Sequence, residues 1–331
     1  MSYDSVFVIG ATGYIGGAVL HALLTNFPGK FKFTALVRNE KDFPALERLG
    51  VKCIKGSFET LDIIEHASAE ADIVVNAANA DALEIAQAVV KGMESRARAG
   101  KGPKPVLLHT SGTGVVADRA NGAYTEYAKK EWNDASEEDI KSIDSFRPHR
   151  NVDLALFEAH SRGLISVHII APSTIVGAGD GPVRTLTQQV PYMVQTAVKN
   201  RTTYYVGPGT NVWRNVDIHD LEDLYVLVLK HALATAAEPN GSPYANFYFG
   251  SVNAHCWGDV ARLIAPILYA KGLTDSPEAK SIELDKEPLL ISTSINSVTK
   301  ADRGLALGWK PMGRTLEEAL QEDIDLTLAQ L

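Results

Sequence analysis

The segment that most constrains the fold is an apolar run followed by three glycines spaced G-x-x-G-x-x-G, at positions 10, 13 and 16. Residues 6–9 predict a buried strand, and residues 15–25 predict a helix. Gly10 permits a sharp turn, Gly13 lets a pyrophosphate approach the main chain, and Gly16 allows close helix–strand packing. Helix N-termini also offer unpaired N–H groups to phosphates. A turn without a ligand is the weaker alternative, because the strand, the glycines and the helix occur together. The predicted cofactor contacts are Gly10, Thr12, Gly13, Tyr14, Ile15 and Gly16.

The residues that follow the second predicted strand, 31–37, indicate which cofactor is bound. The next residues are Arg38 and Asn39, where an NAD site usually has an acid that binds the ribose 2′-hydroxyl. An arginine can instead pair with a 2′-phosphate. Glu40 and Asp42 lie just beyond, so NAD(H) stays possible, and a solvated surface cation is the alternative for Arg38. We therefore predict that NADP(H) is preferred.

Apolar strands alternate with helical segments over the first half of the chain, which is typical of a parallel sheet covered on both faces. This pattern predicts an α/β fold of the Rossmann type, with a doubly wound parallel sheet. We expect an NAD(P)-binding domain over residues 1–175 and a smaller C-terminal substrate domain over residues 176–331, interleaved with the first. Strands are expected at 51–55, 71–76, 106–110, 165–171, 202–206, 213–218 and 246–250. Helices are expected at 61–67, 82–99, 152–161, 220–233 and 316–330.

Composition limits the possible classes of protein. The net charge is −8 without any basic block, so we expect no nucleic-acid partner. Cys53 and Cys256 are far apart in the sequence, which gives no disulfide framework and no metal-ligand spacing. No run of about 18 apolar residues predicts a membrane span. We expect a cytoplasmic protein with a small-molecule substrate and no metal, and a homodimer stays open.

Several motifs together resemble the extended or atypical short-chain dehydrogenase/reductase superfamily, near its epimerase/dehydratase-like and dihydroflavonol-reductase-like branches. The resemblance covers nearly the whole chain. It implies that Ala77, Ala78 and Asn79 line the cofactor, and that Pro172 and Thr174 contact it. The motifs that carry it are residues 10–17, 37–39, 74–78, 109–112, 172–177, 213–221 and 307–311.

The same resemblance implies an active site that this sequence only partly matches. In the family, a Tyr-x-x-x-Lys pair lies on one helix face and a Ser or Thr after the fifth strand polarises the substrate carbonyl. Ser111 fits the latter role, with Thr110 and Thr113 as alternatives, but no Tyr-x-x-x-Lys precedes the sixth strand. If Glu158 matches the family's downstream glutamate, the tyrosine position holds Arg150 and the lysine position holds Leu154.

Other side chains can supply the missing chemistry. Tyr127 is one candidate proton donor, although the residue four positions on is Glu131 rather than lysine. His149 is the second, because histidine exchanges protons near neutral pH without a neighbouring cation. Arg150 can bind an anionic group, and Asp153 can orient either neighbour. The alternative for this segment is a helix cap at Asn151 with surface charge.

Three other polar residues are expected to be structural: His109 as a hydrogen-bonded core histidine, and Asp217 and His219 as supports for the helix that follows them. The function expected is an NADP(H)-dependent oxidoreductase that acts on a carbonyl or conjugated small molecule. A non-catalytic dinucleotide sensor similar to the NmrA-like regulators is the alternative, because those proteins lack the catalytic pair. A sugar-nucleotide epimerase or dehydratase is a third reading, and it depends on the missing Tyr and Lys.

Overall fold

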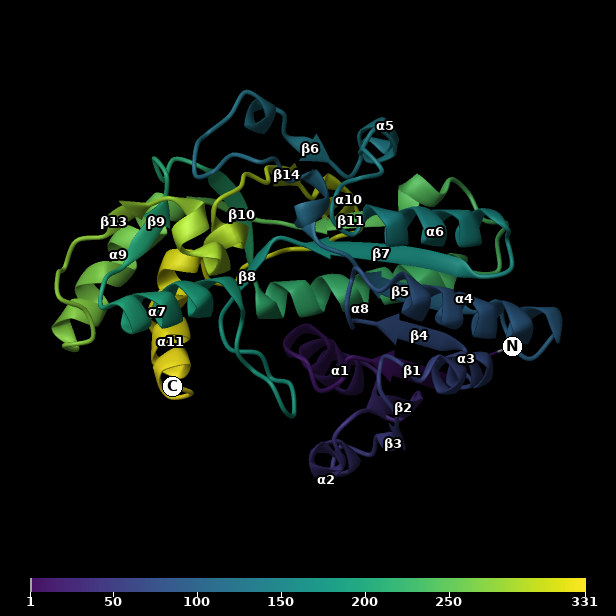
Figure 1. Cartoon of the computed structure of the whole chain (residues 1–331). Coiled ribbons are helices and arrows are strands. Elements are labelled where there is room, and N and C mark those ends of the chain that lie inside the picture. Colours follow the sequence, from purple (N-terminus) through teal and green to yellow (C-terminus); the bar gives the residue numbers. More distant parts are fainter. Residues whose placement is uncertain (1) are drawn as a thin grey trace.

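The computed structural model describes residues 2–331, and a parallel sheet forms its centre (Figure 1). Over these residues the sheet has seven strands in the order β11-β7-β5-β4-β1-β2-β3, all paired in parallel. The strands are β1 Ser5–Ile9, β2 Lys32–Val37, β3 Lys52–Lys55, β4 Ile73–Asn76, β5 Val106–Thr110, β7 Ser166–Pro172 and β11 Phe247–Gly250. The chain order reverses between β1 and β4, as in a doubly wound sheet, which confirms the predicted fold class.

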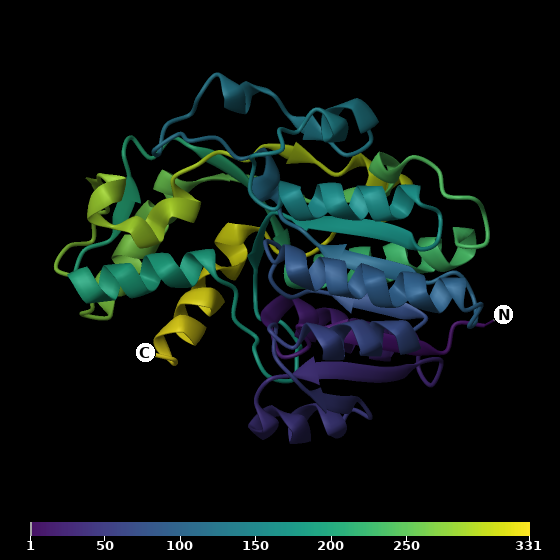
Figure 2. The same cartoon turned by 45° about the vertical axis from the view of Figure 1, so that its right-hand side comes forward.

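Helices cover both faces of this sheet (Figures 1 and 2). On one face, α1 packs against α8, and on the other α3, α4 and α6 pack in succession. Both faces of the strands are therefore covered, so every residue of β5 and β7 is buried and both strands are mostly apolar. The bounds of these helices are α1 Tyr14–Asn26, α3 Leu61–Glu70, α4 Leu83–Arg98, α6 Arg150–Ser161 and α8 Ile218–Thr235.

A second group of elements has its own apolar core, which includes Met193, Trp213 and Trp257. Its strands β8 Thr174–Val176, β10 Val212–Asp217 and β12 Asn253–Cys256 form one small sheet, and β9 Tyr204–Val206 pairs with β13 Lys280–Ile282. Its helices are α7 Gln189–Asn200, α9 Trp257–Ala270 and α11 Leu316–Leu328. The sequence patterns did not predict α7 and α9, because they contain Pro191 and Pro266, which usually interrupt helices.

The two groups exchange segments. The seventh strand of the central sheet, β11, comes from the second half of the chain and pairs with β7. In the other direction, the segment after β5 runs toward late residues, where β6 Trp132–Asn133 pairs with β14 Thr299–Lys300. Asp134 joins the groups by accepting hydrogen bonds from the backbone N–H groups of Phe249 and Arg303. The remaining short helices are α2 Phe43–Glu47, α5 Glu137–Lys141 and α10 Asp302–Ala306.

None of the helices in residues 2–331 combines the length and the apolar composition that crossing a membrane requires.

Candidate functional site

The glycine turn joins β1 to α1 at the carboxyl edge of the sheet. Gly10 has a φ of +93°, and a Cβ there would overlap the backbone carbonyl of Ala77. A Cβ on Gly16 would overlap the carbonyl oxygen of Gly10, so this glycine permits the predicted close packing of helix on strand. The Gly13 N–H donates to the Gly10 oxygen at 2.8 Å, which closes the turn. Gly13 is also the N-cap of α1 and supplies no capping side chain, so the first turn of the helix offers N–H groups to an anion.

A cavity of about 340 Å³ opens at this turn. It lies where ligands bind in doubly wound folds, at the carboxyl ends of β1, β2 and β4. Eight of the predicted cofactor residues line it: Gly10, Thr12, Gly13, Arg38, Asn39, Ala77, Ala78 and Asn79. Leu36, Asp42, Gly56, Ser57, Phe58, Glu59, Val183 and Arg184 complete the lining. The geometry fits a dinucleotide, because glycine backbone, helix N–H groups and arginines converge on one cavity.

Charges of both signs line this cavity. Arg38 follows β2, while Arg184 comes from the loop between β8 and α7, so two segments far apart in sequence supply cations. Glu59 is the nearby acid. The Ser57 hydroxyl donates to it and is the main cause that lowers the pKa of Glu59, and the charge of Arg38 lowers it further. Cations suit phosphate groups, and the acids Asp42 and Glu59 keep the cavity from being uniformly basic.

Five of the predicted cofactor residues do not line this cavity: Tyr14, Ile15, Gly16, Pro172 and Thr174. The Tyr14 hydroxyl donates to the carbonyl oxygen of Gly177 at 2.7 Å, and its burial raises its pKa well above the usual range. Pro172 pairs with Gly250 in the central sheet, and Thr174 pairs with Asn215 of β10. Tyr14 therefore joins α1 to the segment that follows β8.

A second polar group lies beyond the cavity, around His149. The Asp81 carboxylate accepts hydrogen bonds from the backbone N–H and from Nδ1 of His149, at 2.9 and 2.8 Å. Nε2 of the same ring lies 3.2 Å from the position that a Cβ on Gly112 would occupy, and a Cβ on Gly114 would meet it at the same distance. The ring thus rests against the backbone that follows Ser111. Asp81 is in the β4–α4 loop, and its N–H donates to the side chain of Asn79, which lines the cavity.

Ser111 follows β5 and is buried. Its hydroxyl donates to Oδ2 of Asp153 at 3.3 Å. The two alternatives have other partners: the Thr110 hydroxyl is 2.6 Å from the hydroxyl of Tyr225, and the Thr113 hydroxyl accepts from Nε1 of Trp213. Ser111 therefore immediately precedes the backbone that the His149 ring contacts, after the carboxyl end of β5.

Asp153 lies one helical turn after His149, on the same side of α6. It is fully buried, and this burial raises the pKa of Asp153 to about 7, while the Arg150 charge and the Ser111 hydrogen bond oppose the rise. The interpretation as surface charge is therefore wrong for Asp153. The cap at Asn151 is also wrong, because His149 is the N-cap, with a left-handed φ of +64°.

Arg150 and Tyr127 lie apart from this group. Arg150 is fully buried, and Nη2 donates to the carbonyl oxygen of Ile140 at 2.7 Å. Its burial conflicts with the expectation that it binds an anionic substrate or cofactor group. Tyr127 packs beside Trp132 and under the guanidinium of Arg147, and burial raises its pKa. These neighbours group Tyr127 with the segment above the sheet rather than with Ser111.

Two structural expectations are confirmed. His109 is buried beside Asn76, at 3.2 Å between Nδ1 and the Asn76 amide nitrogen, and burial lowers its pKa to about 3. Asp217 caps α8 by accepting from the backbone N–H of His219 at 2.9 Å.

Sequence reasoning missed Asp81, Ser57 and Arg184. No local signal marks Asp81, because its partner His149 is 68 positions away. Arg184 enters the cavity only because its loop returns to α1. The spacing of four between His149 and Asp153 was a usable signal, since it places both on one helix face.

Comparisons with known proteins concern the N-terminal domain and the fold. Residues 10–142 match a family described as NAD(P)H-binding. A relative named oxidase ucsJ, from an Acremonium species, is 28% identical, and the alignment covers 96% of this chain and 95% of that protein. A dTDP-glucose 4,6-dehydratase from Bacillus anthracis, solved in complex with NAD, superposes with a TM-score of 0.67 at 16% identity, covering 98% of this chain and 97% of that one. A UDP-glucose 4-epimerase from Thermotoga maritima superposes with a TM-score of 0.68 at 14% identity, covering 98% of this chain and 99% of that one. Residues 10–142 are therefore similar to NAD(P)H-binding domains, and the whole chain shares the fold of the NAD-bound dehydratase and of the epimerase.

Proposed function

We propose that the protein is an NADP(H)-dependent oxidoreductase that acts on a carbonyl or conjugated small molecule, with His149 in place of the usual tyrosine. The observation that carries the proposal is the pairing of Asp81 with His149 against the backbone after Ser111, next to the dinucleotide cavity. The relative named as an oxidase supports redox chemistry. The free cysteines Cys53 and Cys256 agree with a cytoplasmic location.

The residues that would hold the cofactor come from four segments. The glycine turn and the start of α1 would hold the pyrophosphate, and Ala77, Ala78 and Asn79 would line the rest of the cavity. Arg38 would pair with a 2′-phosphate, and Arg184 of the β8–α7 loop adds a second cation to the cavity lining. A bound reduced nicotinamide supplies the hydride.

Ser111 and His149 then complete the reduction. The Ser111 hydroxyl donates a hydrogen bond to the substrate oxygen and polarises the carbonyl. As negative charge develops on that oxygen, the imidazolium of His149 transfers the proton from Nε2. The Asp81 carboxylate accepts from Nδ1–H, which orients the ring. Asp153 accepts from the Ser111 hydroxyl in the resting protein and so positions it.

The dinucleotide-sensor reading is the second candidate, and the absence of a Tyr-x-x-x-Lys pair from α6 favours it. That helix begins with His149 as its cap, followed by a buried Arg150 and a buried Asp153. The epimerase and dehydratase reading, although suggested by the fold neighbours, depends on the same missing pair. A sensor would bind NADPH without turning over any substrate.

The experiment is a NADPH oxidation assay with a panel of aldehydes, ketones and enones. Once a substrate is found, His149→Ala and Ser111→Ala should each lower kcat by roughly 100-fold or more, because a general acid and a hydrogen-bond donor to the developing negative charge each contribute about that much. Tyr127→Phe tests the other donor and should retain most of the activity. His66→Ala, on the exposed face of α3, is the matched histidine control. Tight NADPH binding with no turnover on the panel would favour the sensor, and wild-type rates in both site variants would place the chemistry elsewhere.

A further inference from the structure

The loop between β8 and α7, residues 177–188, turns back over α1 (Figure 1). Gly181 packs directly on Gly17 of α1, so closely that a Cβ on Gly181 would be 2.9 Å from the carbonyl carbon of Gly17. The same loop carries Val183 and Arg184 into the lining of the cavity. Whatever holds this loop on α1 therefore also decides whether Arg184 reaches the cavity.

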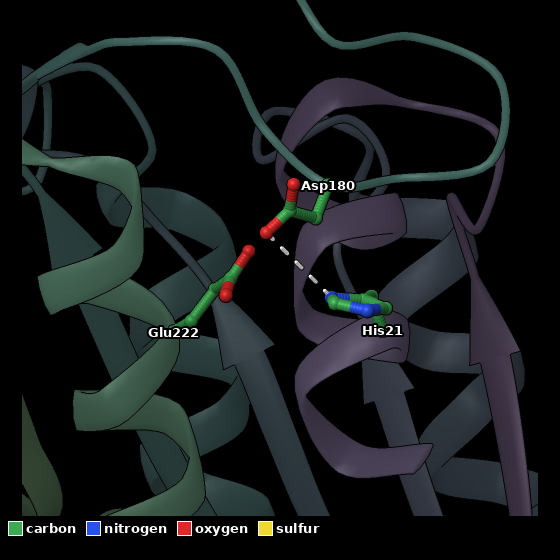
Figure 3. A group of neighbouring side chains, drawn as sticks. All are labelled: His21, Asp180 and Glu222. Atoms are coloured by element: carbon green, nitrogen blue, oxygen red, sulfur yellow. Dashed lines mark ion pairs between the residues drawn. The ribbon is translucent and has the colours of Figure 1, made fainter. Parts of the chain in front are cut away.

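Three side chains from separate segments converge beside this contact (Figure 3): His21 of α1, Asp180 of the loop and Glu222 of α8. One potential ligand atom from each lies within 4.8 Å of the other two. His21 Nδ1 is 3.9 Å from Asp180 Oδ2. In Figure 3 the carboxylate of Glu222 points toward the carboxylate of Asp180, and the His21 ring faces the Asp180 carboxylate from the other side.

Two atoms of this cluster are buried without a partner. Glu222 is only 8% exposed, and among the described residues its Oε1 has no hydrogen-bond partner. His21 Nδ1 is also buried and has no hydrogen-bond partner within residues 2–331. A buried carboxylate oxygen without a donor is costly, and the neighbouring Asp180 adds negative charge. A cation bound between these ligand atoms would satisfy both of them.

His219 extends the cluster by one more nitrogen. It precedes Glu222 by three positions on α8, and its Nε2 is 3.3 Å from Asp180 Oδ2. Its Nδ1 is 2.9 Å from Oδ1 of the buried Asp217. A carboxylate behind a histidine in this way fixes the ring and raises the basicity of its other nitrogen, as is typical of histidines that bind metals.

We propose that His21, Asp180 and Glu222, with His219 in reach, bind one divalent transition metal ion such as Zn²⁺, which fastens the loop to α1 and α8. Imidazole and carboxylate ligands together suit Zn²⁺, whereas Mg²⁺ prefers oxygen ligands alone. Tetrahedral ligand atoms about 2.1 Å from Zn²⁺ lie roughly 3.4 Å apart, so the cluster must contract by about 1 Å. Asp180 can supply this movement, since its side chain is 53% exposed.

This site departs from the expectation of no metal. Its ligands are at positions 21, 180 and 222, so no short spacing in the sequence marks it.

The first test is metal binding by calorimetry on chelator-treated full-length protein, with Zn²⁺ and Mg²⁺ in separate titrations. We expect one Zn²⁺ per chain and no Mg²⁺ uptake. His21→Ala and Glu222→Gln should each weaken Zn²⁺ binding by roughly tenfold or more, and Glu222→Gln preserves the buried shape. His66→Ala is the control for other histidines and should bind as the wild type does. An unfolding curve of each variant, recorded without metal, verifies that the variant is folded. A wild type that takes up no Zn²⁺, or variants that bind it normally, would overturn the site.

The second test asks whether the ion fastens the loop. Arg184 is exposed, so trypsin can cleave after it when the loop opens. If only the closed loop binds the ion, Zn²⁺ at ten times its Kd should slow this cleavage about tenfold. Glu222→Gln should remove the protection, while cleavage at other sites serves as the internal reference. Zn²⁺ binding that leaves cleavage after Arg184 unchanged would contradict the fastening role.

Discussion

Two residues with left-handed backbone, Gly10 and His149, stand at opposite ends of the site and are held there differently. Gly10 has a φ of +93° at the glycine turn, where it needs no side chain and where a Cβ would meet Ala77. His149 has a φ of +64°, which is unfavourable for a residue with a Cβ. Its compensation is the Asp81 carboxylate, which binds both its backbone N–H and its ring. The dinucleotide end thus depends on backbone shape, and the other end depends on side-chain contacts between distant segments.

The largest expected effect is at the glycine turn. Gly10→Ala places a Cβ against the backbone of Ala77 and in an unfavourable φ, so the free energy of unfolding should fall by about 3 kcal/mol or more. Urea unfolding measures it. Gly29→Ala is the matched control, because Gly29 also has a positive φ, of +68°, but no atom lies near its Cβ position. That variant should lose only about 1 kcal/mol. Equal losses would mean that backbone strain alone, and not the contact with Ala77, sets the turn.

Arg38→Ala addresses the charge in the cavity that the turn helps to form. The arginine can make a charge-assisted pair with a 2′-phosphate only, so NADPH affinity should fall by about 2 kcal/mol, roughly 30-fold, with NADH affinity nearly unchanged. Fluorescence titration with both cofactors measures the difference, and the exposed Arg48→Ala is the control for net charge. A wild type that binds NADPH and NADH equally would refute the role of Arg38.

Asp153→Asn examines the buried acid beside Ser111. Burial raises the pKa of Asp153 to about 7 in the folded protein, above the value of about 3.9 expected in the unfolded chain. Between these values the folded state keeps a proton that the unfolded state has lost, so this group lowers stability as pH rises from about 4 to 7. The variant should reduce that slope by up to one proton, about 1.4 kcal/mol per pH unit.

The comparison is between wild type and variant unfolding curves from pH 4.5 to 7.5, since burial also raises the pKa of Glu222 and Asp323 to about 7 and these contribute to both proteins. Identical slopes would show that Asp153 is ionised throughout this range.

The smallest expected effect separates backbone strain from contacts at His149. His149→Gly and His149→Ala both remove the ring, but only glycine adopts the left-handed φ freely. The glycine variant should therefore be about 1 kcal/mol more stable than the alanine variant. Urea unfolding of the pair measures it. If alanine is equally stable, the residue has relaxed to another φ, and the cap of α6 does not require the left-handed backbone.

Predictions from local pattern succeeded where neighbours in the sequence make the structure. The strands, their parallel arrangement and five residues of the cavity lining follow from apolar runs, the glycine spacing and the end of the second strand, whereas Ala77, Ala78 and Asn79 were implied by the family resemblance. Arg150 and Asp153 show where such reasoning ends. The sequence predicted that Arg150 binds an anionic group and that Asp153 orients a neighbour, with surface charge as the alternative. Both are fully buried instead, because α6 packs against α4 and against the segment around Ile140.

By itself the sequence determined the strand–turn–helix unit, the α/β class and the chemistry available after β2 and β5, since these depend on backbone geometry and on periodicity within about twenty residues. Only the tertiary structure decided that Asp81 meets His149, that Asp153 loses its contact with water, and that His21, Asp180 and Glu222 surround one point. The physical reason is that hydrogen bonding and desolvation act between whichever groups packing brings within a few ångströms. Local propensity does not determine the distances between residues that are far apart in the sequence.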